Sequence, residues 1–85
     1  MRVAKQGEQF VVTDGTNTLS FTQAKYEDLF YAIPNNNATL FRLINDTILE
    51  DPGLRGIFKK MIEKAGGIDP CLDDLQKQVQ SVQPG

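Results

Sequence analysis

The chain has 85 residues, of which 40% are hydrophobic and 24% charged, a length and mixture that suit one small globular domain and exclude two. Nine basic and eleven acidic residues give a formal net charge of −2, which argues against a general polyanion-binding surface and is too small for a nucleic-acid mimic. With no histidine and one cysteine, the chain lacks the commonest general base and cannot form an internal disulfide framework.

The beginning of the chain and its apolar runs bear on the cellular compartment. Residues 1–5 lead into the polar residues 6–9 without the apolar stretch of a secretory signal. No apolar run approaches the roughly 20 residues that a transmembrane helix needs. These features and the single cysteine predict a cytoplasmic protein that does not contact a membrane.

The N-terminal residues 1–22 predict a small antiparallel β-meander of two or three strands. Residues 2–5 and 9–13 are the first two candidate strands, and the second contains a Phe-Val-Val run of β-formers. The Asp-Gly-Thr-Asn sequence at 14–17 is typical of a hairpin connection, because Asp-Gly tolerates the positive φ angles of tight turns. Apolar residues alternate with Thr and Ser in 18–22, so the Leu and Phe of this strand should face the core.

A first helix is expected to begin near Thr22, whose hydroxyl can cap free N–H groups, and to stop before Pro34. Tyr31 falls on the opposite side of this helix from its apolar residues, beside Glu27 and Asp28. It is therefore the best candidate for an exposed aromatic side chain; the alternative is that a neighbouring loop or the sheet edge covers it. The expected inner face consists of Tyr26, Leu29, Phe30 and Ile33.

A second helix is predicted for residues 38–50, with Asn37 as its N-cap. Leu49 lies among the polar positions near the end of this helix, where it either packs onto the next helix or belongs to a contact surface. The expected core residues are Leu40, Phe41, Leu43, Ile44 and Ile48.

A third helix is expected to begin at Pro52, with Asp51 as cap, and to end at Gly66-Gly67. Its two faces are sharply divided, which predicts that one face is buried and the other is solvated or binds a partner. The apolar face contains Leu54, Ile57, Phe58, Met61, Ile62 and Ala65. The basic residues of the other face are Arg55, Lys59, Lys60 and Lys64.

A fourth helix is predicted for residues 70–82, after Asp69, followed by a flexible tail at 83–85. Its apolar stripe is thinner and consists of Leu72, Leu75, Val79 and Val82. The stripe either completes the core of the monomer or pairs with a second copy to form a homodimer. The chain is thus predicted to be a single α+β domain over 1–85, with a meander at 1–22 and a helical part at 23–82.

Catalytic chemistry finds little support in the sequence, which predicts no enzyme, cofactor or metal site. Cys71 would lie in the first turn of a helix, where the helix dipole lowers a thiol pKa, but nearby aspartates act in the opposite direction. We therefore expect a buried, inert cysteine. The adjacent acidic pairs diverge by 100° on a helix and do not converge on one substrate atom, so we expect them to form caps and solvated faces. These pairs are Glu27-Asp28, Glu50-Asp51 and Asp73-Asp74.

Binding to a larger protein is the leading functional hypothesis. Small chains without catalytic groups commonly act as adaptors, assembly factors or inhibitors, including inhibitors encoded by phages. Aromatic and arginine side chains dominate binding hot spots, so Tyr31, with Glu27 beside it, and Arg55 are the first candidates. The other candidates are Lys59, Lys60 and Lys64. The alternative is a nucleic-acid-binding protein, in which the helices at 38–50 and 53–65 form a pair similar to a helix-turn-helix.

Overall fold

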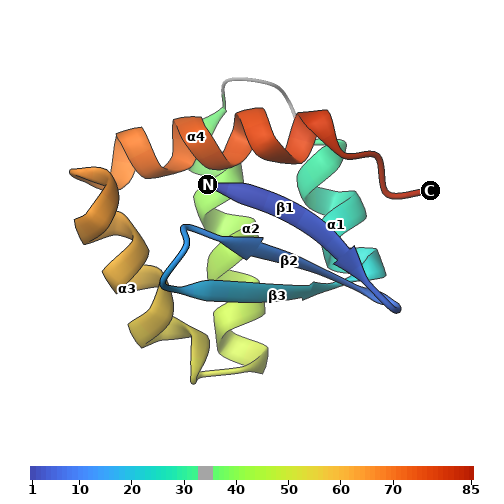
Figure 1. Ribbon diagram of the computed structural model, residues 1–85, viewed down its shortest axis with the longest axis horizontal. Coiled ribbons are helices and arrows are strands. Elements are labelled where there is room, and N and C mark those ends of the chain that lie inside the picture. The colour runs from blue at the N-terminus through green and yellow to red at the C-terminus, as the bar shows by residue number, and fades with distance from the viewer. Residues whose placement is uncertain (33–35) are drawn as a thin grey trace.

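The structure is a computed structural model that describes residues 1–32 and 36–85. Within these residues the chain forms a three-stranded antiparallel sheet followed by four helices (Figure 1), which confirms the predicted α+β fold. The strands are β1 (Arg2–Gln6), β2 (Gln9–Thr13) and β3 (Thr18–Thr22). The helices are α1 (Gln23–Phe30), α2 (Asn37–Glu50), α3 (Leu54–Ala65) and α4 (Ile68–Ser81).

The sheet is a meander in which β2 lies between β1 and β3. A two-residue turn joins β1 to β2, and its Gly7 has a φ of 62°, which glycine adopts without a Cβ clash. The face of the sheet that turns toward the viewer in Figure 1, away from the helices, carries mainly Thr, Ser and Gln side chains. The inner face carries the buried residues Val3, Phe10, Val12, Leu19 and Phe21.

The helices enclose the inner face of the sheet. In Figure 1, α2 lies behind the sheet, α4 runs beside β1, and α3 and α1 lie at opposite ends of the strands. All seven elements contribute buried side chains to one hydrophobic cluster. A domain of this size buries only about 60% of its unfolded surface, so each of these elements is needed to close the core.

Tyr26 joins the sheet, α1 and the end of α4. Its ring is fully buried and stacks on Phe10, with centroids 3.9 Å apart and an interplanar angle of 5°. Its hydroxyl oxygen lies 2.6 Å from the carbonyl oxygen of Val82 and 3.0 Å from that of Val79, and the single hydroxyl proton is shared between them. Burial raises the pKa of Tyr26 to about 12, so the hydroxyl keeps its proton and remains a donor.

The predicted beginning of α1 is confirmed. The hydroxyl of Thr22 accepts a hydrogen bond from the backbone N–H of Lys25 at 3.2 Å, which satisfies one of the free donors of the first turn. Tyr26 and Leu29 are buried and Phe30 is partly buried, as expected for the inner face. Ile33 and Pro34, which completed that prediction, lie outside the described residues.

α2 begins one residue earlier than predicted, because the N-cap is Asn36 and not Asn37. The side-chain oxygen of Asn36 accepts from the N–H of Thr39 at 3.1 Å. The buried residues of α2 also include Thr47. Its hydroxyl tolerates burial because it donates to the carbonyl of Leu43 at 3.2 Å. Of the two alternatives for Leu49, packing onto the next helix is wrong, since this side chain is 72% exposed.

The predicted beginning of α3 is also wrong, because the helix begins at Leu54 and the Asp51 side chain does not cap it. The N–H groups of Leu54 and Arg55 instead bond to the carbonyls of Asp51 and Pro52, at 3.0 and 3.2 Å, in tight i→i+3 turns. The predicted end is confirmed: Gly66 is left-handed with a φ of 91°. Ala65, expected on the apolar face, is exposed.

α4 begins at Ile68, two residues before the predicted position. Pro70 is tolerated in this first turn because N–H groups at that position have no intrahelical acceptor to lose. The expected apolar stripe lies in the monomer core, where Leu72, Leu75 and Val79 are buried. The stripe therefore completes the core of one chain, and the homodimer through residues 70–82 stays a prediction.

The end of the chain, where the sequence predicts a flexible tail at 83–85, contacts α1 through Val82 and Pro84. Pro84 is buried, and its carbonyl accepts a hydrogen bond from the side-chain amide of Gln23. Together with the bond from Tyr26 to Val82, this contact holds the end of the chain beside α1. No helix within residues 1–32 and 36–85 is both long and apolar enough to cross a membrane.

Candidate functional site

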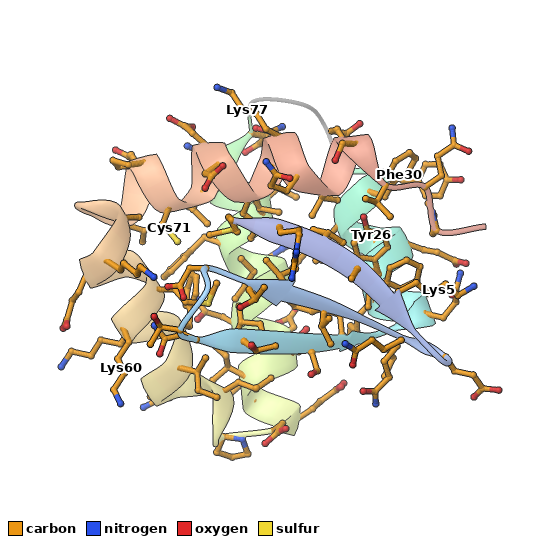
Figure 2. All side chains as sticks on the ribbon, in the orientation of Figure 1. Lys5, Tyr26, Phe30, Lys60, Cys71 and Lys77 are labelled. Carbon is orange, nitrogen blue, oxygen red and sulfur yellow. The ribbon has the colours of Figure 1, made fainter. Side chains whose placement is uncertain are left out.

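Tyr31 stands at the end of α1 with its side chain in solvent. It is 74% exposed, so the prediction of an exposed aromatic is confirmed and the alternative, that a loop or the sheet edge covers it, is wrong. Its ring and the ring of Phe30 make a T-shaped contact, with centroids 5.0 Å apart and an interplanar angle of 88°. Phe30 lies beside the end of α4 (Figure 2), and its carbonyl accepts from the side-chain amide of Gln80 at 2.8 Å. The exposed ring therefore sits on a fixed support.

Two carboxylates flank Tyr31 on the preceding turn of α1. The N–H of Tyr31 donates to the carbonyl of Glu27 at 2.9 Å, so helical geometry continues to Tyr31 and residues three and four positions earlier are its neighbours. The carboxylate of Glu27 accepts from the side-chain amide of Gln23 at 3.0 Å. Asp28 is exposed. The sequence candidates included Glu27 and omitted Asp28, although the spacing of three residues was enough to identify it.

The outer face of α3 carries three of the predicted basic candidates. Arg55, Lys59 and Lys60 are exposed, and Lys60 points away from the body of the molecule in Figure 2. In the part of the chain that the structure describes, none of the three lies within ion-pair distance of a carboxylate. They lie across the molecule from the α1 end that carries Tyr31 (Figure 1), so the structure does not combine the two groups of candidates into one surface.

Lys64, the fourth basic candidate, is engaged within the domain. Its Nζ donates to the carbonyl of Asp14 at 2.7 Å and to the hydroxyl of Thr16 at 3.1 Å, and it lies 3.7 Å from an Asp14 carboxylate oxygen. This lysine therefore ties the end of α3 to the β2–β3 loop. Helical periodicity placed it on the solvent face, but it could not show that the loop lies within reach of the long side chain.

The β2–β3 loop is organised around the carboxylate of Asp14. One oxygen accepts from the backbone N–H groups of Thr16 and Asn17 at 2.9 and 2.7 Å, and the other accepts from the Asn17 side chain at 3.1 Å. Hydrogen bonds from the Asn17 and Thr16 backbone, together with the positive charge of Lys64, lower the pKa of Asp14 from 3.8 to about 2. The carboxylate thus closes the hairpin and pairs with α3.

The lowered pKa of Asp14 predicts a loss of stability in acid. Because the folded pKa lies below the ordinary value, the contribution of the carboxylate is complete above about pH 4 and disappears as the pH falls to about 2. Asp14→Asn should lower the free energy of unfolding at pH 7 by about 1–2 kcal/mol, and its difference from the parent should shrink between pH 4 and pH 2. Urea unfolding from pH 2 to 7 measures both effects. Asp46→Asn, at an exposed carboxylate, is the control; a constant difference across this pH range would contradict the prediction.

Cys71 is fully buried on the inner side of α4 (Figure 2), as predicted. Burial raises the pKa of its thiol, and the negative charges of Asp74 and Asp14 raise it further. The thiol therefore stays protonated and shielded from solvent. Among the described residues, no group of three or more cysteine or acidic side chains is arranged to hold a metal ion.

A surface hollow of about 530 Å³ lies between the β1–β2 turn and the beginning of α1. Its lining includes Lys5, Glu8 and Gln23. The hollow is at the opposite end of α1 from Tyr31, so it is separate from the candidate surface. None of the residues predicted from the sequence to bind a partner lines it.

The predicted pairing of two helices for nucleic-acid binding concerns α2 and α3. Their aromatic rings Phe41 and Phe58 meet with centroids 6.3 Å apart. The backbone of α3, however, runs closest to α4 and β3. Arg55 is exposed near the beginning of α3, the part of a recognition helix that usually reaches base edges.

The surface formed by Tyr31, Glu27 and Asp28, called here the Tyr31 surface, combines an exposed aromatic side chain with charged groups within the described residues. The α3 face, formed by Arg55 and two lysines, is the second candidate. Comparison with known proteins does not choose between them. The chain matches no protein-family model, no curated protein and no solved structure.

Proposed function

We propose that this chain is a small, non-enzymatic protein-binding module that acts in the cytoplasm as an adaptor, assembly factor or inhibitor, and that it covers part of a larger protein with its Tyr31 surface. The observation that carries the proposal is the side chain of Tyr31, which is 74% exposed and yet supported by Phe30. We include in this proposal the inhibition of host machinery by a phage-encoded protein.

The support beneath Tyr31 is the physical reason for choosing this surface. Burial of a tyrosine ring at an interface removes a large apolar area from water, and tyrosine is enriched among residues that dominate binding energy. Ordering a mobile side chain on binding opposes association. The edge contact with Phe30 and the bond from Gln80 to the Phe30 carbonyl reduce that penalty, because the ring and its base are positioned before the partner arrives.

Capture of partners from a lysate of the native host tests the proposal. The tagged chain is compared with Tyr31→Ala and with Leu49→Ala, a matched control that removes another large, exposed apolar side chain. Tyr31→Ala should weaken capture of a nuclease-resistant protein partner by about tenfold or more, equivalent to about 1.4 kcal/mol, while Leu49→Ala retains it.

Thermal unfolding separates a binding defect from a folding defect in the same variants. Both alanine substitutions should leave the melting temperature within a few degrees of the parent, since exposed positions contribute little to stability. A large loss of stability in Tyr31→Ala would show that the side chain belongs to the core. Equal capture by the two variants and the parent would remove Tyr31 from the interface.

Nucleic-acid binding through the α3 face is the second candidate function. It is favoured by the exposure of Arg55, Lys59 and Lys60 without a carboxylate at ion-pair distance in the described part of the chain. The engagement of Lys64 with Asp14 reduces the charge available on this face. Nuclease treatment of the lysate discriminates the two candidates, because material bound through nucleic acid is lost and a direct protein partner is retained.

A further inference from the structure

The residues that follow α4 lie in a site on the side of α1. Residues 82–84, called here the strap, leave helical geometry at Val82, whose φ of −128° and ψ of 109° are those of an extended chain. The hydroxyl of Tyr26 donates to the carbonyl of Val82, and the side-chain amide of Gln23 donates to that of Pro84. α1 therefore holds an extended segment by its backbone carbonyls, which every sequence in this conformation supplies.

The side chains of the strap add selectivity to these backbone contacts. Val82 packs against the hydrophobic core and Pro84 is buried, whereas Gln83 between them is exposed. Proline suits a buried position in an extended segment, because its φ is fixed and its nitrogen has no hydrogen that needs an acceptor. The site thus accepts an apolar residue and a proline two positions later, and it makes no demand on the residue between them.

The groups that form the site are positioned independently of the strap. The ring of Tyr26 stacks on Phe10, and the side-chain amide of Gln23 also donates to the carboxylate of Glu27 at 3.0 Å. The Tyr26 hydroxyl has a second acceptor in the carbonyl of Val79, at 3.0 Å, so no buried donor is left unpaired when the strap leaves. A site that is shaped before its ligand arrives loses little conformational freedom on binding.

We infer that this side of α1 is a binding site for an extended Val-x-Pro segment of another protein, and that the strap occupies it in the free domain as a competing ligand. The strap is itself such a segment, held in the site by Gln23 and Tyr26. Its tether to α4 gives it an effective concentration on the order of mM, so a separate segment must displace it. These contacts do not involve Tyr31, and the inference therefore goes beyond the function proposed for the Tyr31 surface.

A peptide with the sequence of residues 81–85, acetyl-Ser-Val-Gln-Pro-Gly-amide, tests the inference in an NMR titration of the full chain. The parent should bind it weakly, because the strap fills the site. Pro84→Ala should loosen the strap and lower the dissociation constant of the peptide by about tenfold or more, since a larger fraction of the sites is open. The side-chain amide of Gln23 and the backbone amide of Tyr26 should shift. Gln83→Ala, at the exposed position of the strap, is the matched control and should bind the peptide as the parent does.

Two further comparisons show whether the peptide occupies the strap site. A peptide with alanine in place of proline should bind the Pro84→Ala chain about tenfold more weakly than the proline peptide, because it lacks the buried ring. Gln23→Ala, added to Pro84→Ala, should also weaken binding of the proline peptide, since it removes the donor to the proline carbonyl. Tyr31→Ala in the same background should not change it, so that this inference and the proposed function fail or succeed separately.

The inference would be overturned by equal affinity of the proline peptide for the parent and for Pro84→Ala, or by shifts that spare Gln23 and Tyr26. Thermal unfolding shows whether Pro84→Ala is folded. If it is not, the parent chain provides the test: at several mM, the proline peptide should shift the same two residues and the alanine peptide should not. Identical effects of the two peptides on the parent would overturn the inference as well.

Discussion

Ending the chain after Gly67, and so removing α4, is expected to leave an unfolded polypeptide. α4 packs against α1, α2, α3 and β1 and contributes four side chains to the core: Cys71, Leu72, Leu75 and Val79. Burial of a Leu or Val side chain contributes about 1.5–3 kcal/mol. Small domains are stable by only about 0.05–0.15 kcal/mol per residue. The loss is therefore comparable with the whole stability of the domain.

Circular dichroism and dispersion of amide signals in an NMR spectrum measure the outcome of the truncation. The truncated chain should lose helical signal beyond the share of the missing residues, together with the dispersion that a folded sheet gives. Lys77→Ala in the full chain, on the exposed side of α4 (Figure 2), should keep both signals. A folded, monomeric truncated product would contradict the packing described here and would restore α4 as an element for self-association.

Phe10→Ala is expected to have the second largest effect. The ring is fully buried and stacks on Tyr26 at 3.9 Å. Truncating a buried Phe to Ala costs about 3–5 kcal/mol, through lost transfer free energy and the remaining cavity. This cost already includes most of the free energy of the Phe10–Tyr26 stack, which is about 0.5–1.5 kcal/mol on its own. Since the domain has little stability in reserve, a large part of this variant should be unfolded at 25 °C.

Urea unfolding monitored by tyrosine fluorescence and circular dichroism measures this loss. Phe10→Leu is the matched control, because it keeps most of the apolar volume and removes the aromatic stack; it should cost less than half as much as Phe10→Ala. A cost below about 1 kcal/mol for Phe10→Ala would show that the core relaxes around the missing ring and that the stack is not central to stability.

The sheet was predictable because its signals are local. Alternation of apolar and polar residues in β3 determines which face is buried, and the Asp-Gly dipeptide marks the turn that precedes it. The N-cap of α1 was predictable for the same reason, since Thr22 lies three residues before Lys25, whose N–H donates to its hydroxyl. Burial of Leu19 and Phe21 follows directly from this alternation.

The predicted beginnings of helices were less accurate where a proline provided the sequence signal. The Asp-Pro pairs predict the first turn of both α3 and α4, but a proline fits several positions there, because none of the early N–H groups has an intrahelical acceptor. At Pro52 the chain makes tight turns before the helix begins, and at Pro70 the helix has already begun. The same dipeptide thus stands on opposite sides of the two helix boundaries.

The candidate site was predictable to the extent that it lies on one helix. The angular position of Tyr31 indicated its exposure, and spacing along α1 indicated its carboxylate neighbours. The roles of Lys64 and of Pro84 depend on contacts across 48 or more residues of sequence. Periodicity within one element does not contain this information, so the sequence predicts Lys64 on a solvated face and Pro84 in a flexible tail.

The hydrogen bonds at the end of the chain also constrain the order of events during synthesis. Tyr26 and Gln23 donate to carbonyl groups 53 to 61 residues further along the chain. On the ribosome the donors emerge first, as part of an incomplete domain whose core still lacks Leu72, Leu75 and Val79 of α4. The apolar side chains that α4 covers stay accessible to chaperones until α4 leaves the exit tunnel, and the domain closes only when its last turn of helix arrives.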